Sequence, residues 1–320
     1  MEIALLGLVA SAILTILAYP RFIAFLETRG SKQTVSEYAL DAFKNKKKTP
    51  TFGGALFVIV PIVVALILNG FNVNRDLWLL VLVFGSYAFI GFVDDYKIVT
   101  EGKNDGISPR TKMLSQLVLS VVFYVIYIQT GGDNLLAIPF VKQPIDLGIG
   151  YLFLIMFMFA GASNAVNLTD GMDGLAGGTT LIALIPFAYL AIKLGRNSVL
   201  LFILSLIGAL IGFLVFNRKP AKIFMGDVGS LALGAALAAI SVLLGAELIF
   251  AVVGGVFVFE TVCVIIQRTS WKIRKKRVFR YTPIHYSFTL NGWEETDVVN
   301  LFYAIGLVCM VIGSVLIALT

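Results

Sequence analysis

The stretch SVLLFILSLIGALIGFLVF, residues 198–216, carries no charged residue and is long enough to cross a membrane as one helix. Within a bilayer every backbone polar group must be bonded inside the segment, which favours helices of about 20 apolar residues. Hydrophobic residues make up 58% of the 320-residue chain and charged residues only 14%, whereas soluble domains are about one quarter charged. The sequence therefore predicts an all-α, polytopic integral membrane protein.

Similar apolar runs recur along the whole chain and predict about ten transmembrane helices, packed as one domain over residues 1–320. The first run lacks a basic start and is too long for the apolar region of a signal peptide, so we expect it to remain as the first span. The least certain boundary is the short link near Gly245. The predicted spans are 3–26, 52–69, 76–95, 114–130, 150–166, 178–194, 198–216, 229–245, 247–267 and 298–319.

Lysine and arginine are distributed unevenly between the loops that join these spans. The odd-numbered loops, with the end of the first span, hold 21 of the 25 basic residues. Because cytoplasmic loops of membrane proteins are enriched in Lys and Arg, these loops are predicted to be cytoplasmic and both termini extracytoplasmic. The same bias explains the net charge of +6 without nucleic-acid binding. Residues 268–297 are long enough for a cytoplasmic subdomain, and Cys263 and Cys309, inside apolar segments, are expected to be unpaired core residues.

The conspicuous polar motifs fall on the same cytoplasmic loops, where the ends of several spans can converge on one site. Asp94 and Asp95, in FVDDY, end an apolar span. Adjacent helical residues point about 100° apart, so one carboxylate is free to bind a metal while the other meets a second substrate. The alternative is a solvated helix end, although an acidic pair at a helix C-terminus opposes the helix dipole.

The segment GASNAVNLTDGMDGLAGG, residues 161–178, places a polar side chain at every third position. On a helix or a tight helical turn, Asn164, Asn167, Asp170 and Asp173 would share one stripe. Such a stripe suits ribose hydroxyls, amide edges or a hydrated Mg²⁺. A capped helix junction is the structural alternative, and it accounts for fewer of these residues.

Four further residues have both a functional and a structural interpretation. Asp227, in IFMGDVGS, is either a helix N-cap or a metal ligand. Phe224 either stacks on a base or anchors the membrane interface. His285 is the only histidine, and its basic and aromatic surroundings suit phosphate binding, although a lone histidine is often structural. Glu260 lies inside the ninth predicted span and either lines a groove or caps a helix break.

These motifs resemble those of the phospho-N-acetylmuramoyl-pentapeptide transferase family, membrane enzymes that make the first lipid intermediate of peptidoglycan. TPTFGG is similar to the family's TPTMGG, and RVFRYTPIHYSFTLNGW to its RIF-x-x-x-PIHHHFEL-x-GW. The motifs that match almost letter for letter are GFVDDY, SNAVNLTDGMDGLA and FMGDVGSLALG. Two departures stand out: the family's triple histidine is His285-Tyr286-Ser287 here, and the lysine expected three residues after the acidic pair is Ile98.

The resemblance implies a role for each matching residue. Asp94 and Asp95 would engage and activate a lipid phosphate, and Asp227 would bind Mg²⁺. His285 would lie near the sugar phosphate, and Phe224 would stack on uracil. The remaining residues that it implies are Asn167, Asp170 and Asp173 on the nucleotide, and Lys46 and Lys112 against the diphosphate charge.

The implied reaction transfers phospho-MurNAc-pentapeptide from UDP-MurNAc-pentapeptide to undecaprenyl phosphate at the cytoplasmic face of a bacterial inner membrane, giving lipid I and UMP. We expect direct attack on the β-phosphorus, with a covalent aspartyl-phosphate route left open. A sister enzyme that transfers another UDP-N-acetylhexosamine phosphate, such as GlcNAc-1-phosphate, is the first alternative. A transporter is disfavoured, because transporters place their polar residues near the membrane midplane. The oligomeric state is left open, with a homodimer as one option.

Overall fold

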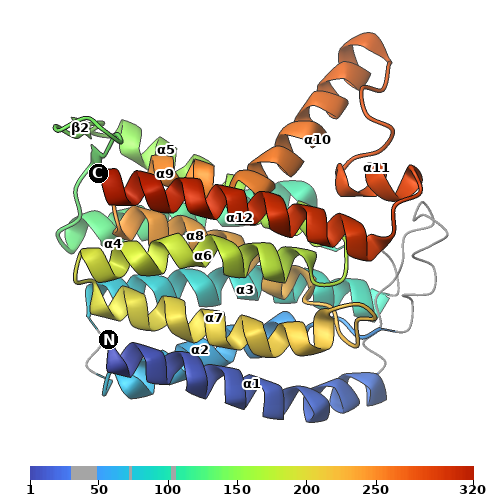
Figure 1. Ribbon diagram of the computed structural model, residues 1–320, viewed down its shortest axis with the longest axis horizontal. Coiled ribbons are helices and arrows are strands. Elements are labelled where there is room, and N and C mark those ends of the chain that lie inside the picture. The colour runs from blue at the N-terminus through green and yellow to red at the C-terminus, as the bar shows by residue number, and fades with distance from the viewer. Residues whose placement is uncertain (30–48, 72–73, 102–105) are drawn as a thin grey trace.

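A computed structural model of the chain describes residues 1–29, 49–71, 74–101 and 106–320, and it is almost entirely helical (Figure 1). The helices of the first half are α1 (Glu2–Thr28), α2 (Gly54–Leu68), α3 (Arg75–Glu101), α4 (Pro109–Gln129) and α5 (Gly150–Thr169). Those of the second half are α6 (Leu175–Lys193), α7 (Asn197–Asn217), α8 (Gly226–Leu243), α9 (Glu247–Val253), α10 (Gly255–Arg274), α11 (His285–Leu290) and α12 (Glu295–Leu319). A two-stranded antiparallel hairpin, β1 (Leu135–Leu136) and β2 (Ile145–Asp146), lies between α4 and α5.

The prediction of a polytopic helical membrane protein is confirmed, since eight helices of the described chain are long and apolar enough to span a membrane. Two of the ten predicted spans differ from straight spanning helices. The span predicted over 52–69 is α2, whose 15 residues fall short of the usual length. The span predicted over 247–267 is divided between α9 and α10, which pass the length and hydropathy test together but are bent by 80° at the Gly254-Gly255 pair. The expected break near Gly245 is present, and Gly245 has a φ of +61°.

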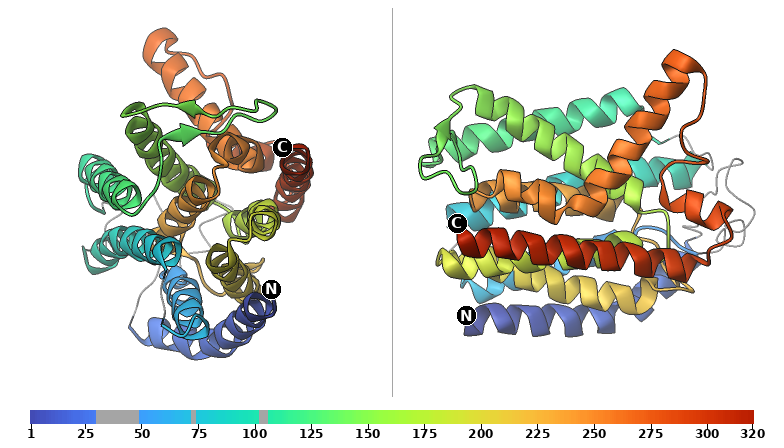
Figure 2. Two further views of the ribbon diagram at one scale, coloured as in Figure 1. Left: turned by 90° about the vertical axis from the view of Figure 1, so that its left-hand side faces the viewer. Right: turned by 45° about the horizontal axis from the view of Figure 1, so that its top comes forward.

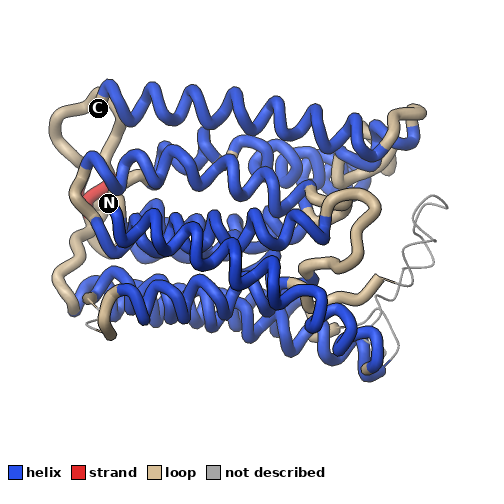
Figure 3. Tube along the Cα trace, turned by 60° about the horizontal axis from the view of Figure 1, so that its bottom comes forward, coloured by secondary structure: helices blue, strands red, loops and turns tan. Residues whose placement is uncertain are grey.

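The chain termini and the polar motifs lie at opposite ends of the bundle. Figure 1 shows the N-terminus, the C-terminus and the β1-β2 hairpin at one end, with α11 at the other. Figure 3 shows both termini at the same end from below, with loops at both ends of the bundle. Both termini therefore lie at one end of the bundle; that this end is extracytoplasmic stays a prediction from the basic loops.

The central helix of the bundle is α8, and its residues Val228–Leu243 are all buried. The end-on view in Figure 2 shows α8 surrounded by the other helices. Small residues allow this close packing. A Cβ on Gly91 of α3 would lie 2.1 Å from the backbone oxygen of Asp227, and one on Gly234 would lie 2.2 Å from the oxygen of Ala162 on α5. The first turn of α8, which carries Asp227, is therefore held in the middle of the polar end.

Beyond its bend, α10 leaves the bundle at an angle, and the chain returns through α11 to α12 (Figures 1 and 2). Ile284 and Cys263 join a second buried apolar cluster with residues of α12 and the start of α6. Cys263 and Cys309 are both free thiols, as expected. The cluster ties the returning loop to the bundle, while a separate subdomain over 268–297 stays a prediction.

Candidate active site

Three carboxylates from two helices meet at the polar end of the bundle. Asp94 and Asp95 come from the last turns of α3, and Asp227 from the first turn of α8. One oxygen from each lies within 4.8 Å of one from each of the others. The two neighbouring aspartates thus reach one cluster despite the angle between adjacent helical positions, because the start of α8 packs directly against α3.

Asp94 and Asp227 share a cation. The Nζ atom of Lys112, on α4, lies 3.1 Å from Asp94 Oδ2 and 2.6 Å from Asp227 Oδ2. Asn167, on α5, donates to Asp227 Oδ1 at 2.6 Å and to Ser230 Oγ at 2.9 Å. These contacts fix the Asp227 carboxylate from two helices, α4 and α5, that are distant from it in sequence.

Asp95 is held by the backbone at the start of α8. Its Oδ2 accepts a hydrogen bond from the Val228 N–H at 3.1 Å. A carboxylate at a helix N-terminus meets unpaired N–H groups and the positive end of the helix dipole. Gly226 has a φ of +67°, and a Cβ there would lie 2.3 Å from Asp95 Oδ2. The glycine before Asp227 is therefore required by both backbone conformation and space.

The donor set of this cluster fits a divalent metal ion. Asp94 is only 4% exposed and Asp95 6%, so their mutual repulsion is weakly screened. Lys112 is the one side-chain cation that the described residues place against them, which leaves three carboxylates facing one ammonium. Oxygen ligands of this kind are those that Mg²⁺ prefers. The acidic cluster can therefore hold a metal, and the described residues contain no other group of three potential metal ligands that meets the same distance limit.

The segment TPTFGG pairs with the segment that precedes Asp227. Phe224 N–H donates to the Pro50 oxygen at 2.9 Å, and Gly53 N–H donates to the Phe224 oxygen at 2.8 Å. A Cβ on Gly53 would lie 2.6 Å from that same oxygen, so the close approach of the two backbones requires glycine. The pairing holds the backbone of Phe224, whose side chain is half-buried, three residues before Asp227. Lys46 lies outside the described residues.

The predicted stripe of polar residues from 164 to 173 is not formed as one face, because α5 ends at Thr169. Asn164 donates to Gln116 on α4 at 2.8 Å, whereas Asn167 reaches Asp227. Asp170 caps the end of α5 and is half-buried. Asp173 is buried in the following turn, where its Oδ2 accepts from the Ala221 N–H at 3.0 Å. Of the four, Asn167 therefore contacts the three-carboxylate cluster directly, through its hydrogen bond to Asp227.

His285 and its neighbour pack against the turn that follows α5. His285 is fully buried, and a Cβ on Gly171 would lie 2.2 Å from its Nε2. The Tyr286 hydroxyl donates to the Gly171 oxygen at 3.2 Å, and burial, assisted by the negative charge of Asp170, raises the pKa of Tyr286 above its ordinary value. Ser287 instead bonds within its own loop, accepting from the Tyr281 N–H and donating to the Tyr281 oxygen. Of the two residues that follow His285, Tyr286 contacts the turn at Gly171 and Ser287 supports the loop.

Three supporting residues carried no signal in the sequence. Gln116, Ser230 and Glu295 look like ordinary polar residues in or beside apolar spans, yet each accepts a hydrogen bond from the 164–173 segment. Glu295, at the start of α12, accepts from the Asp173 N–H at 2.9 Å. Only the packing of α4 and α8 against α5, and of the start of α12 against the turn that follows α5, could reveal these contacts. Glu260, left undecided by the sequence, bonds to the loop of His285.

Comparison with known proteins agrees with this geometry. Residues 77–245 match the model of the family described as glycosyl transferase family 4. Over 314 residues the chain is 41% identical to the phospho-N-acetylmuramoyl-pentapeptide-transferase of a Geobacillus species (strain WCH70), covering 98% of this chain and 97% of that one. The chain belongs to the phospho-N-acetylmuramoyl-pentapeptide-transferase family.

Two further members of this transferase family show the same extent of similarity. The Oceanobacillus iheyensis protein is 42% identical, with 97% of this chain and 96% of the relative covered. The Shouchella clausii protein is 44% identical, with 96% and 95% covered. The similarity therefore spans the bundle, the carboxylate cluster and the loop of His285 together, and it makes the chain a membrane-bound transferase.

Proposed function

We propose that the chain transfers phospho-MurNAc-pentapeptide from UDP-MurNAc-pentapeptide to undecaprenyl phosphate, giving lipid I and UMP. The observation that carries this proposal is the acidic cluster with Lys112 at one end of an apolar bundle. A polyprenyl phosphate keeps its tail in the bilayer and its phosphate at headgroup depth, where a soluble nucleotide can also reach. The relatives are named for this transfer.

Both substrates are anions, so the site must offset their repulsion. We assign Asp227, with Asp94 and Asp95 beside it, to Mg²⁺, which would supply positive charge to the phosphate oxygens when bound. Lys112 adds a fixed ammonium at the same place. Lys46 is assigned the same role on sequence grounds alone.

The nucleotide is assigned to the neighbouring surface formed by the end of α5 and the segment before α8. Asn167 and Asp170 offer an amide and a carboxylate for hydroxyl and amide groups, and Phe224 offers a ring for uracil. Asp173 acts on the nucleotide through the 218–224 segment, since its carboxylate bonds to the Ala221 N–H. His285 lies on the sugar-phosphate side, beside Gly171.

The chemical step is a direct displacement. An oxygen of the lipid phosphate attacks the β-phosphorus, the bond from that phosphorus to the bridging oxygen breaks, and UMP leaves with the electron pair. Asp94 or Asp95 accepts any proton still carried by the attacking phosphate. A phosphoenzyme trapped with donor in the absence of acceptor lipid would instead indicate the covalent route.

The reaction takes place at the cytoplasmic face of a bacterial inner membrane, since UDP-sugars are cytoplasmic and the basic loops flank the site. The test is UMP release by the purified chain with undecaprenyl phosphate, comparing UDP-MurNAc-pentapeptide with UDP-GlcNAc, with and without Mg²⁺. Metal-dependent release from the first donor alone is the expected result. Release from UDP-GlcNAc alone would keep the reaction type and overturn the substrate, and release from neither by folded protein would overturn the proposal.

A further inference from the structure

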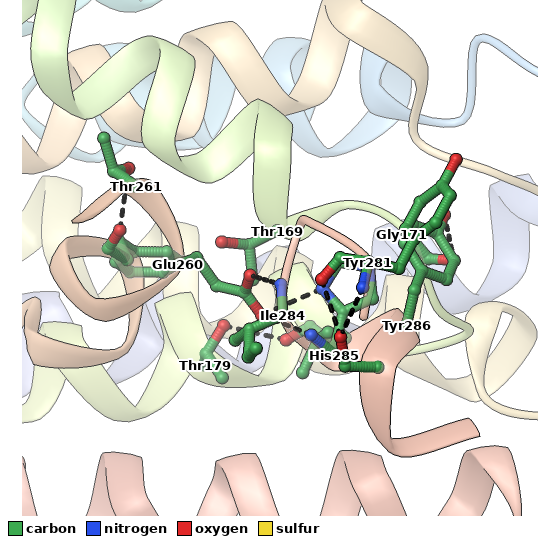
Figure 4. A network of polar contacts seen from close by, with 12 residues as sticks. Thr169, Gly171, Thr179, Glu260, Thr261, Tyr281, Ile284, His285 and Tyr286 are labelled. Atoms are coloured by element: carbon green, nitrogen blue, oxygen red, sulfur yellow. Dashed lines mark hydrogen bonds and ion pairs between the residues drawn. The ribbon is translucent and has the colours of Figure 1, made fainter. Parts of the chain in front are cut away.

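Glu260 is a fully buried carboxylate in the second turn of α10, six residues beyond Gly254 at the helix bend. Figure 4 shows it reaching the start of α11. Its Oε2 accepts from the Ile284 N–H at 2.8 Å. Its Oε1 lies 3.3 Å from the His285 backbone N and 2.9 Å from His285 Nδ1. One carboxylate thus binds two backbone amides and one side chain of the same loop.

A buried carboxylate is costly unless hydrogen-bond donors surround it. Three donors converge on Glu260, so this loop supplies what the charged form requires. Two of the contacts are to backbone and would hold the loop whatever the residue at 285. The third contact is to the imidazole. Unlike the two backbone contacts, it also affects which ring nitrogen of His285 carries a proton.

An ionised carboxylate accepts hydrogen bonds and cannot donate them, so the ring nitrogen that faces Glu260 must carry the proton. That nitrogen is Nδ1. Nε2, the other ring nitrogen, is buried without a hydrogen-bond partner among the described residues. It lies against Gly171, where no side chain separates it from the turn between Asp170 and Asp173. The geometry therefore leaves Nε2 as the ring nitrogen without a hydrogen-bond partner among the described residues, packed on the turn at Gly171 where a donor held by that turn would meet it.

We infer that Glu260 is a positioning residue that keeps Nδ1 of His285 protonated and aims Nε2 at a sugar or phosphate group of the bound donor. The assignment of the ligand rests on the proposed function, whereas the orientation of the ring does not. A neutral ring offers Nε2 as an acceptor to a hydroxyl or amide N–H. A protonated ring offers it as a donor to a phosphate oxygen, and Glu260 stabilises either form through Nδ1.

His285 is the only histidine of the chain, so ¹⁵N-histidine labelling reports on this ring alone. In detergent and without substrates, the ¹⁵N shifts of the wild-type ring should show a proton on Nδ1, in the neutral or the charged form. A neutral ring with its only proton on Nε2 would overturn the inference. This measurement needs neither a variant nor an activity assay. It therefore tests the orientation of the His285 ring even if the purified chain shows no transfer reaction.

The variant Glu260→Gln tests the positioning role. Its amide has one acceptor oxygen for three donors and presents an N–H₂ group, so Nδ1 should become an acceptor and the proton should move to Nε2. The kcat/KM for the nucleotide donor should fall about 10-fold to 100-fold, as when the partner of a metal-ligating histidine is removed. Nδ1 still protonated in Glu260→Gln, with unchanged kcat/KM, would contradict the inference.

Thr261→Val is the matched control. Thr261 follows Glu260 on α10, and among the described residues its hydroxyl donates to the Phe257 oxygen of the same helix (Figure 4). The exchange is close to isosteric and leaves the three bonds of Glu260 in place. Both the ¹⁵N spectrum and kcat/KM should match the wild type. A spectrum shifted as in Glu260→Gln would show that any change in α10 moves the ring and would overturn the specific role of Glu260.

Discussion

Lys112 Nζ lies 2.6 Å from Asp227 Oδ2, although the two residues are 115 positions apart in the chain. The same ammonium lies 3.1 Å from Asp94 Oδ2, so it occupies a place between two carboxylates where a metal ion would also be attracted. Lys112 and a bound metal ion would therefore both be attracted by the charges of Asp94 and Asp227. Each should affect how strongly the other is held.

Replacing Lys112 with methionine should separate the effect of its charge on metal binding from its effect on turnover. Without the ammonium, the three carboxylates should bind a divalent ion at least about 3-fold more tightly, because an opposing positive charge has been removed. Turnover should fall about 100-fold, comparable to the loss of one transition-state donor. Mn²⁺ binding followed by electron paramagnetic resonance measures the first, and UMP release the second. Lys142→Met, in an exposed residue near β2 at the opposite end, is the control, and equal or weaker metal binding in Lys112→Met would contradict the argument.

The contact between α3 and α8 gives a prediction about stability. A Cβ on Gly91 would collide with the backbone of Asp227, so Gly91→Ala should destabilise the fold by about 1–3 kcal/mol and lower activity by displacing the first turn of α8. Gly85 lies on the same helix, and a Cβ there would meet no atom within 4 Å. Gly85→Ala should therefore leave thermal stability equal or slightly higher. Equal melting temperatures for the two variants in detergent would show that the α3-α8 contact is looser than described.

The sequence predicted the spans well because hydrophobic runs of membrane length are long and their breaks are polar. It missed the bend at Gly254-Gly255, since a glycine pair inside an apolar run has the same hydropathy in a straight and in a bent helix. The prediction also made the helix α2 too long. The apolar run includes Phe52 and Gly53, which lie in the loop before the helix, and hydropathy does not distinguish the loop from the helix.

Within the candidate site, residues on well-marked loops were predicted and residues inside spans were not. Asp94, Asp95 and Asp227 stand out where apolar runs end, and the fold brings them together. Gln116 is fully buried within α4, and nothing in its neighbours predicts that it faces Asn164. Such pairs depend on how the helices are rotated against one another, which hydropathy does not encode.

Tyr286 follows the buried His285 in α11, and it offers a prediction about pH. Burial raises its pKa above the ordinary value of about 10, so the phenol stays protonated and its stabilising contribution is intact below that pH and lost only above it. Tyr286→Phe removes one hydrogen bond to Gly171, worth about 0.5–1.5 kcal/mol, so activity should fall about 2-fold to 10-fold. The shape of the pH profile from about pH 6 to 9 should not change. A shifted profile would show that Tyr286 ionises in this range.

Asp170 and Asp173 are three residues apart, but replacing each with alanine should affect different properties of the protein. Asp173 is buried and holds the half-buried Ala221 N–H, so Asp173→Ala removes a hydrogen bond to a charged group and should cost about 1–3 kcal/mol of stability. Asp170 is half-buried at the end of α5, so Asp170→Ala should lower the melting temperature less while reducing kcat/KM for the nucleotide donor by at least about 10-fold. Melting temperature and donor kinetics measured on both variants decide the matter. If Asp173→Ala kept full stability and lost donor affinity, its carboxylate would contact the nucleotide itself rather than the loop that carries Phe224.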